Sequence, residues 1–248
     1  MRYLILSDIH SNIEALEASI QRAKQAGYDS ALCCGDLVGY GPNPKEAIDG
    51  IRALNALTIR GNHDRVAAGI DEATQFNPHA RRAIYWTREV LPESYREYLV
   101  SLPVGPLDVT EGVQLVHGAV SHEDDYIFTE ADADDNFSLT DKKITFFGHS
   151  HFPVVFVTDA RGQSNLALSY ECDEYIAVNC EPGKSMLVNP GSIGQPRDAD
   201  PRASFAIWDQ DQARIEFYRV EYDIARTQEK MRAAQLPTYL IDRLSQGR

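Results

Sequence analysis

Apolar residues near the start of the chain come in short runs, and each run stops at polar residues. Residues 2–8 first alternate between polar and apolar, then form an apolar run of Leu and Ile, and end in polar residues. This pattern is typical of a buried strand that ends at a functional site. The runs at 31–34 and 56–59 end in the same way. The pattern therefore predicts three buried strands with polar residues at their carboxyl ends.

The segments between these runs carry the signals of helices. Ile13, Leu16 and Ile20 recur at helical spacing, and Gly27 closes the segment. A second helix is predicted over 45–54, directly after a proline. Strands that alternate with helices at this spacing predict βαβ units and a mostly parallel sheet, in which ligands gather beyond the carboxyl ends of the strands.

The pattern changes twice in the remainder of the chain. Residues 78–102 predict two helices broken before Pro92, which we expect to form a capping element. Short runs of β-type residues follow, at 113–116, 144–147, 154–157, 175–178, 185–188, 204–207 and 215–220. Two closing helices are predicted at 223–235 and 237–245. We find no linker and no repeat beyond the βαβ rhythm, which favours a single domain over residues 1–248.

Composition narrows the function classes. The 248 residues are 43% hydrophobic and carry a formal net charge of −13, so binding to nucleic acid or to anionic membranes would need a local positive centre. No apolar run approaches the ~20 residues of a bilayer span, and the first apolar run is too short for a signal peptide. We expect a cytoplasmic protein that does not bind membranes.

The four cysteines predict no disulfide framework. Cys33, Cys34, Cys172 and Cys180 form no CxxC pair, and a chain of this length does not need disulfides to hold its core. Cys33 and Cys34 lie in an apolar run, so we interpret them as buried strand packing.

Residues 122–141 form a dense acidic block. A solvated surface loop is the simpler interpretation of such a block. The alternative is a segment at the rim of a site, because the block follows His117 closely.

Histidines provide the main chemical signal. Five of the seven stand in short polar clusters at the ends of predicted strands, namely His10, His63, His117, His149 and His151. With Asp8, Asp36 and Asn62 they exceed what one metal ion can use. Two cations about 3.5–4 Å apart need a bridging carboxylate, and Asp36, alone at the central strand end, is the natural bridge. If Asp-x-His and His-x-His are extended, residues two apart point to the same side and reach one cavity.

These clusters resemble, in identity and order, the five motif blocks of the calcineurin-like metallophosphoesterase family. The blocks are Asp8-x-His10, Gly35-Asp36, Gly61-Asn62-His63-Asp64, His117 and Gly148-His149-Ser150-His151. Two later segments, Asn189-Pro190-Gly191-Ser192 and Pro196-Arg197-Asp198, look like one that is frequent in small bacterial members. The resemblance thus covers most of the chain, and it implies an α/β fold in the form of a four-layer α/β/β/α sandwich.

The resemblance also implies an enzyme that hydrolyses phosphate esters with water activated by two divalent metal ions. By this likeness the first metal is held by Asp8, His10 and His151, the second by Asn62, His117 and His149, and Asp36 bridges them. His63 is then free to protonate the leaving oxygen, and Asp64 orients it. Mixed imidazole and carboxylate ligands suit Mn, Fe, Zn, Co or Ni, of which we expect manganese.

One departure from the family pattern bears on the substrate. Serine/threonine protein phosphatases and symmetrical diadenosine tetraphosphatases carry Asp-Arg-Gly where this chain has Gly39-Tyr40-Gly41. A phosphate clamp of those relatives is therefore missing, and Arg65 and Arg197 are candidate substitutes in substrate binding. The absence of the clamp favours phosphodiesters over phosphomonoesters among small phosphoester substrates.

Two other functions remain open. A non-catalytic metal-site scaffold that binds protein partners, like the retromer subunit of the same fold, need not keep His63 or a full ligand set, and this chain keeps both. A nuclease is disfavoured by the net charge and by the lack of a basic stripe interleaved with aromatic residues, although bound metals would attract phosphate.

Overall fold

The protein is built on two six-stranded sheets. The computed structural model describes residues 1–159, 162–168 and 174–248. The first sheet has the order β3 (Leu57–Thr58), β2 (Ser30–Cys33), β1 (Arg2–Leu6), β11 (Ala203–Asp209), β12 (Arg214–Val220) and β9 (Tyr175–Asn179). The second has the order β4 (Leu107–Thr110), β5 (Val113–Leu115), β6 (Ile144–Phe146), β10 (Met186–Pro190), β7 (Pro153–Thr158) and β8 (Ser164–Leu168).

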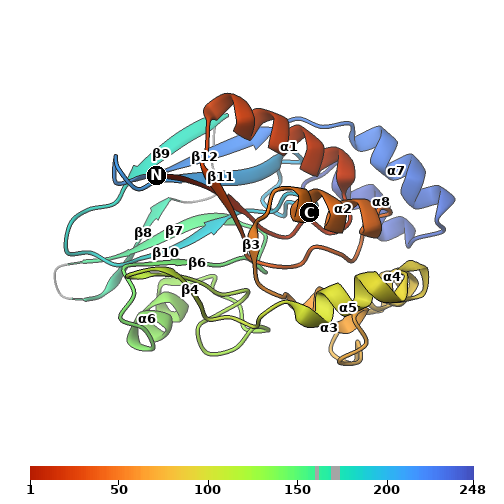
Figure 1. The fold of residues 1–248 in the computed structure, drawn as a ribbon, viewed down its shortest axis with the longest axis horizontal. Helices are drawn as coiled ribbons and strands as arrows, with labels where there is room; N and C mark the ends of the chain where they lie inside the picture. Colours follow the sequence, from red (N-terminus) through yellow and green to blue (C-terminus); the bar gives the residue numbers. More distant parts are fainter. Residues whose placement is uncertain (160–161, 169–173) are drawn as a thin grey trace.

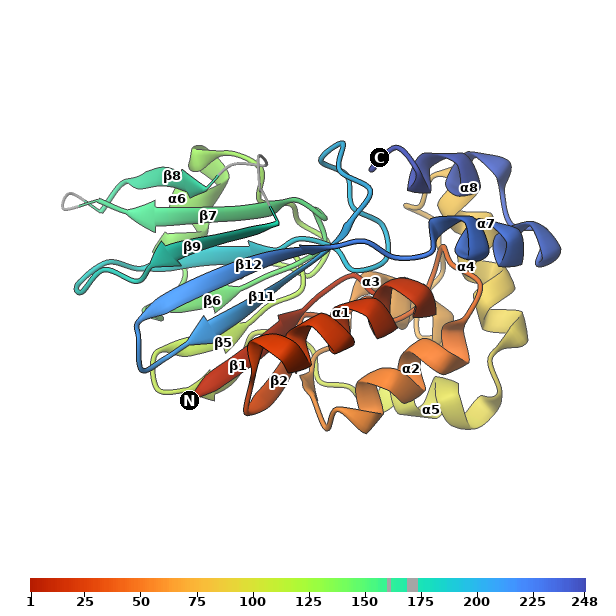
Figure 2. The same ribbon diagram turned by 90° about the horizontal axis from the view of Figure 1, so that it is seen from above.

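Helices cover the outer faces of the sheets and gather at one end of them (Figure 1). The described helices are α1 (Ile13–Ala26), α2 (Pro44–Ala53), α3 (Asn62–Ala67), α4 (Pro78–Val90), α5 (Glu93–Ser101), α6 (Glu130–Ser138), α7 (Ile224–Ala233) and α8 (Thr238–Leu244). Figure 2 shows α1 and α2 along the first sheet, with α3, α4, α5, α7 and α8 beyond the strand ends. None of the helices among the described residues has both the length and the apolar composition needed to cross a bilayer.

Alternating side chains of the central strands build the layers. Leu4 and Leu6 of β1 pack with Leu16 of α1 on the outer face of the first sheet. Ile5, between them, faces the other way and packs with Phe146 of the second sheet, as the period-2 geometry of a strand requires. Other buried residues connect the second sheet to α6. The molecule is therefore a mixed α/β protein in which two sheets lie face to face between helices.

The expectation of a mostly parallel sheet was wrong. β1, β2 and β3 run parallel, as do β5, β6 and β10, but β11, β12, β9, β4, β7 and β8 pair antiparallel to their neighbours. The physical reason is connection length. Only residues 210–213 join β11 to β12, and a parallel crossover needs a dozen or more residues.

The acidic block is not all loop. Residues 130–138 form α6, so the interpretation of 122–141 as a surface loop was wrong for this part. The backbone N–H of Asp132 donates a hydrogen bond to the Thr129 hydroxyl, and the backbone N–H of Thr129 donates one to the Asp132 carboxylate. This capping box, with acidic residues in the first turn, stabilises the helix start.

Most of the other predicted elements are present. The helical pattern at 78–102 is divided into α4 and α5 around Pro92. Among the described cysteines, Cys33 and Cys34 are buried without disulfides, and burial raises the pKa of the Cys34 thiol well above its usual range. Cys172 lies outside the described residues.

Candidate metal centre

The polar clusters predicted at the strand ends meet in one place. Asp8 follows β1, Asp36 follows β2, and His117 follows β5. His10 lies between β1 and α1, Asn62 begins α3, and His149 and His151 lie in the loop between β6 and β7. All the predicted ligands are buried, namely Asp8, His10, Asp36, Asn62, His117, His149 and His151. The fold therefore gathers residues more than 140 positions apart into one polar site inside the protein.

Most of these residues sit on left-handed backbone. The φ angles are 53° at Asp8, 47° at His10, 56° at Asp36, 64° at His149 and 66° at His151. The assumption that the Asp-x-His and His-x-His segments are extended was therefore wrong. Residues other than glycine rarely adopt positive φ, and where they do they cluster at functional sites.

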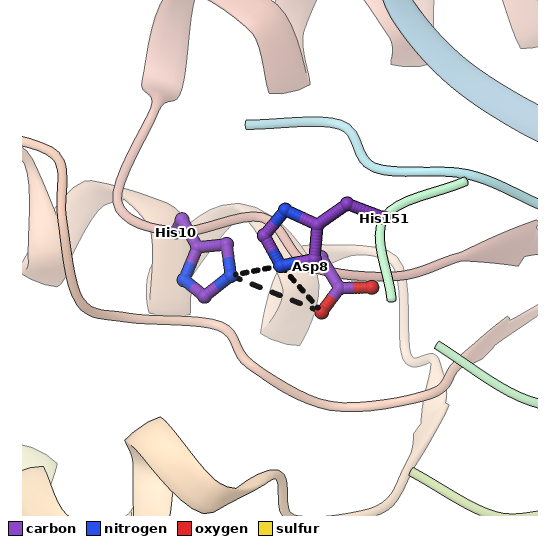
Figure 3. Close-up of side chains that lie close together, drawn as sticks. All are labelled: Asp8, His10 and His151. Carbon is purple, nitrogen blue, oxygen red and sulfur yellow. Dashed lines mark hydrogen bonds and ion pairs between the residues drawn. The ribbon is translucent and has the colours of Figure 1, made fainter. Parts of the chain in front are cut away.

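Asp8, His10 and His151 form the first group of potential ligands (Figure 3). His10 Nδ1 lies 3.1 Å from the Val38 carbonyl oxygen, and His151 Nδ1 lies 2.6 Å from the Gln195 carbonyl oxygen. Since a carbonyl only accepts, each neutral ring carries its hydrogen on Nδ1 and a lone pair on Nε2.

The two Nε2 lone pairs face each other. His10 Nε2 and His151 Nε2 are 3.0 Å apart. Asp8 Oδ1 lies 3.4 Å from His151 Nε2 and 3.8 Å from His10 Nε2. Three acceptors that converge in a buried place without a donor between them fit a bound cation, and histidine ligands commonly donate their second ring N–H to a carbonyl in this way.

Asp36, His117 and His149 form a second group. His117 Nδ1 lies 2.8 Å from the Cys34 carbonyl oxygen, so its Nε2 faces inward, 3.1 Å from Asn62 Oδ1 and 3.4 Å from Asp36 Oδ2. His149 Nε2 is buried with no hydrogen-bond partner among the described residues. An orphaned imidazole nitrogen beside three other acceptors again fits a cation.

Asp36 is shared by the two groups. Its Oδ2 lies 3.6 Å from His10 Nε2 and 3.4 Å from His117 Nε2, whereas its Oδ1 accepts a hydrogen bond from the His63 backbone N–H. Burial alone would lower the pKa of His117, but the Asp36 carboxylate raises it to about 10. A position that stabilises a proton this strongly also favours a metal cation.

His63 lies beside the ligand groups, and burial lowers its pKa as it lowers those of His10, His149 and His151. Burial lowers the pKa of His63 to about 4, and its Nδ1 has no hydrogen-bond partner among the described residues. A side chain on Gly39 would come within 2.3 Å of this nitrogen, so glycine allows the ring to lie against the backbone. His63 also falls within 4.8 Å of ligand atoms of His10 and Asp36, so distance alone does not separate a ligand from an acid.

Asp64 contacts the backbone. Its carboxylate accepts hydrogen bonds from the N–H groups of Val38 and Gly61, at 3.2 and 3.1 Å. Burial and then the Asp36 charge raise its pKa to about 7. Asp64 thus fixes the start of α3, which carries His63. Among the described residues we find no hydrogen bond between the side chains of Asp64 and His63.

A cavity of about 390 Å³ opens onto the centre, and both candidate arginines line it. The Arg65 guanidinium forms ion pairs with Glu123 and Asp124 of the acidic block. Arg197 Nη2 donates to the Tyr40 hydroxyl at 3.3 Å and to Gln195 Oε1 at 3.2 Å. The alternative interpretation of the acidic block, a rim segment, therefore holds for its first residues.

Sequence reasoning missed two features of the site. The Tyr126 ring stacks on His149 with centroids 4.0 Å apart. The Ser7 hydroxyl donates to Asp8 Oδ2 at 2.6 Å, and a side chain on Gly148 would come within 2.0 Å of that hydroxyl. No local pattern marks Tyr126, but Ser7 adjoins a ligand in the sequence and could have been inferred from that position, as the close approach at Gly148 was.

The two-sheet α/β fold with a buried Asp, His and Asn cluster at strand ends is that of the metallophosphoesterase family. A family model described as the calcineurin-like phosphoesterase superfamily domain matches residues 1–213, and the chain belongs to this metal-dependent family. It is 40% identical over 248 residues to an uncharacterised protein of Methanocaldococcus jannaschii, covering 98% of this chain and 97% of that protein.

Solved structures agree with this assignment. A metallophosphoesterase from Sphaerobacter thermophilus is 38% identical to this chain and superposes on it with a TM-score of 0.87. The match covers 100% of both chains. A hypothetical protein from Pyrococcus horikoshii is 23% identical with a TM-score of 0.79, over 100% of this chain and 98% of that one. At this lower identity the second likeness shows the fold alone.

Proposed function

We propose that this protein is a phosphoesterase with a binuclear metal centre that hydrolyses small phosphate esters. The observation that carries the proposal is the convergence of acceptor atoms on two adjacent places that share Asp36 Oδ2. Such a pair of sites is what two-metal hydrolysis of a phosphate ester needs. The single-domain organisation and the cytoplasmic location remain predictions.

The proposed ligand sets follow the two groups of acceptors. Asp8, His10 and His151 hold the first metal, Asn62, His117 and His149 the second, and Asp36 bridges them. Manganese is the ion we propose. Fe, Zn, Ni or Co are the other candidates, because mixed imidazole and carboxylate ligands suit all of these metals and availability decides among them. When bound, such ions supply Lewis acidity that activates water and neutralises phosphate oxygens.

We assign the leaving-group proton to His63. Its ring lines the cavity and packs among His10, Tyr40 and Phe76, with centroids 4.5–4.8 Å away. Burial lowers the pKa of the imidazole to about 4, and an anionic ester bound beside it would raise this pKa and favour uptake of a proton. Asp64 serves by fixing the turn from which His63 projects.

Arg197 is the better candidate for binding the phosphate. No carboxylate forms an ion pair with its guanidinium among the described residues, and Nε is buried without a partner there. By contrast, a phosphate at Arg65 would compete with Glu123 and Asp124. One positive group in addition to the metals suits a singly charged diester better than a doubly charged monoester, so we propose a preference for phosphodiesters.

The test is a substrate and metal panel. Metal-stripped protein would be assayed on bis-p-nitrophenyl phosphate, p-nitrophenyl phosphate and cyclic nucleotides, with each metal added back. We expect hydrolysis that requires metal, is highest with manganese and favours the diester. Higher efficiency on p-nitrophenyl phosphate would refute the diester preference. Absence of hydrolysis with every metal would favour the scaffold, and cleavage of oligonucleotides in preference to small esters would favour the nuclease.

The bridging role of Asp36 makes a separate prediction. Asp36→Asn should lower the metal content at both sites and reduce turnover more than any other single ligand change, because one carboxylate serves both ions. Asp135→Asn, at an exposed carboxylate on α6, is the control and should keep wild-type values. Metal content would be measured by mass spectrometry of desalted protein. Two metals per chain in Asp36→Asn with near-normal turnover would exclude the bridge.

A further inference from the structure

Residues 195–198 connect three parts of the molecule. The Gln195 carbonyl oxygen accepts a hydrogen bond from His151 Nδ1 in the metal centre. Arg197 lines the cavity. Asp198 forms an ion pair with Arg219 of β12, and both side chains are 0% exposed. The cavity wall is thus joined to the first sheet by a fully buried pair of opposite charges.

The guanidinium of Arg197 is held by neutral groups on the cavity side. Tyr40 and Gln195 accept its hydrogen bonds, and Tyr126 is a third hydrogen-bond partner. These contacts leave its positive charge unmatched, but an arginine side chain has many rotamers and needs a fixed backbone to stay in one of them. The residues that follow Arg197 contribute to this fixation.

Several contacts fix the backbone after Arg197. Arg219 bonds to the Arg202 carbonyl oxygen as well as to Asp198, so it spans both ends of the 198–202 turn. Ala199 has a φ of 65°, and its N–H donates to the Gly247 carbonyl oxygen. A buried ion pair costs desolvation and is weak evidence for stability, whereas it can specify one conformation over others.

We propose that Asp198 and Arg219 form a positioning pair that orients Arg197 for binding of the phosphate group. This inference rests on the proposed function, because Arg197 is assigned there to substrate binding. Neither member of the pair touches the substrate. The pair acts through the backbone of Arg197, and its loss should weaken substrate binding while the metals and the acid His63 stay in place.

The main test replaces both charges at once. Asp198→Leu with Arg219→Met avoids a lone buried charge, and such replacements often preserve stability. We expect the melting temperature and the metal content to stay near wild type, kcat to change little, and KM for bis-p-nitrophenyl phosphate to rise roughly 10- to 100-fold, as misplacement of a positioning group can cause. An unchanged KM would overturn the proposal. If the double variant does not fold, Arg219→Lys keeps the charge, loses the planar fork and should raise KM by a smaller factor.

A mutant cycle separates positioning from a general structural effect. If the pair acts through Arg197, adding the double change to Arg197→Ala should raise KM no further, whereas multiplied effects would show that the pair acts elsewhere. The matched control is Arg2→Met, which breaks part-buried ion pairs with Asp209 and Glu216 in the same sheet. It should lower the melting temperature and leave KM unchanged.

A second readout does not depend on activity. The ¹⁵N NMR signal of the Arg197 Nε–H group, assigned by its loss in Arg197→Ala, should show a rigid side chain in the wild type and a mobile one in the double variant. If the wild type hydrolyses no phosphate ester, the proposed function fails, and the NMR result still decides whether the pair orders Arg197. A rigid Arg197 in the double variant would refute the positioning role.

Discussion

At the scale of single residues, the contact made by Nδ1 separates three ligand histidines of the centre from His63. His10, His117 and His151 each place Nδ1 against a backbone carbonyl, which leaves Nε2 with a lone pair for a metal. His63 has no such partner for Nδ1 among the described residues. The three anchored rings are prepared as ligands, and His63 is left able to exchange a proton.

His63→Ala tests this distinction. The variant should keep both metals, because the ligand sets do not need this ring, and should lose turnover by roughly 10²–10⁴-fold, the usual contribution of a positioned acid. The loss should be smaller for p-nitrophenyl esters, whose leaving group needs little protonation, than for a nucleotide ester. Steady-state kinetics on both substrate types, with metal analysis, would measure this.

Asp64→Asn is the companion change. It should slow turnover less than His63→Ala, because the amide retains one acceptor for the N–H groups of Val38 and Gly61 and the imidazole is still present. Loss of a metal from His63→Ala, or an equal defect on good and poor leaving groups, would reassign His63 to metal binding or to electrostatic support.

At the scale of elements, helix starts are tied to the loops of the site. The Asn12 side chain accepts from the Ala15 N–H at the start of α1 and donates to the Gly194 carbonyl oxygen, so one residue caps the helix and holds a loop beside His10. The Thr227 hydroxyl of α7 also bonds to Asn12 Oδ1. The start of α1 therefore also holds the loop at Gly194 and helix α7.

Asn12→Ala should destabilise the fold more than an ordinary cap loss. The lost cap costs about 1 kcal/mol, and the buried carbonyl of Gly194 left without its donor adds about 1–3 kcal/mol. Thr129→Ala, which removes the cap of the more exposed α6, is the control and should cost only about 1 kcal/mol. Urea unfolding at a fixed metal concentration would compare them, and equal losses would show that the contact to Gly194 contributes nothing.

At the scale of the whole molecule, the candidate centre joins the two sheets. Asp8 and Asp36 follow strands of the first sheet, and His117 and His149 follow strands of the second. An ion bound by ligands from both sheets would stabilise their packing, since a ligand that binds only the folded state adds free energy of unfolding. Metal removal should therefore lower the melting temperature of the entire protein.

The metal-dependent gain in melting temperature should depend on pH. Burial raises the pKa of Asp8 to about 7, and Asp36 overcomes the effect of burial on His117 and raises its pKa to about 10. In the metal-free protein both groups bind protons near neutral pH, and metal binding must release them. Metal affinity should therefore fall as the pH falls through 7.

Thermal unfolding with manganese and with a chelator at pH 6, 7 and 8 would measure this gain, with potassium chloride as the control for ionic strength. We expect the largest gain at pH 8. Calorimetry in buffers of different ionisation enthalpy should show protons released at pH 7. A gain that is independent of pH, or proton uptake, would contradict the proposed ligand roles of Asp8 and His117.

The sequence by itself predicted most of the strands and helices, but not β4, β8 or α3. It also predicted that polar residues at strand ends would meet, because apolar period and the position of polar residues at strand ends are local properties of the chain. It failed for α6, whose acidic residues suggested solvent but which a capping box makes helical. Tertiary structure decided the rest. Loops from both sheets meet at one edge, and several features of the site depend on this meeting. They are the left-handed turns at Asp8 and His149, the ion pairs of Arg65 and the stacking of Tyr126 on His149. Contacts between residues more than a hundred positions apart arise from the packing of the sheets, which no local pattern encodes.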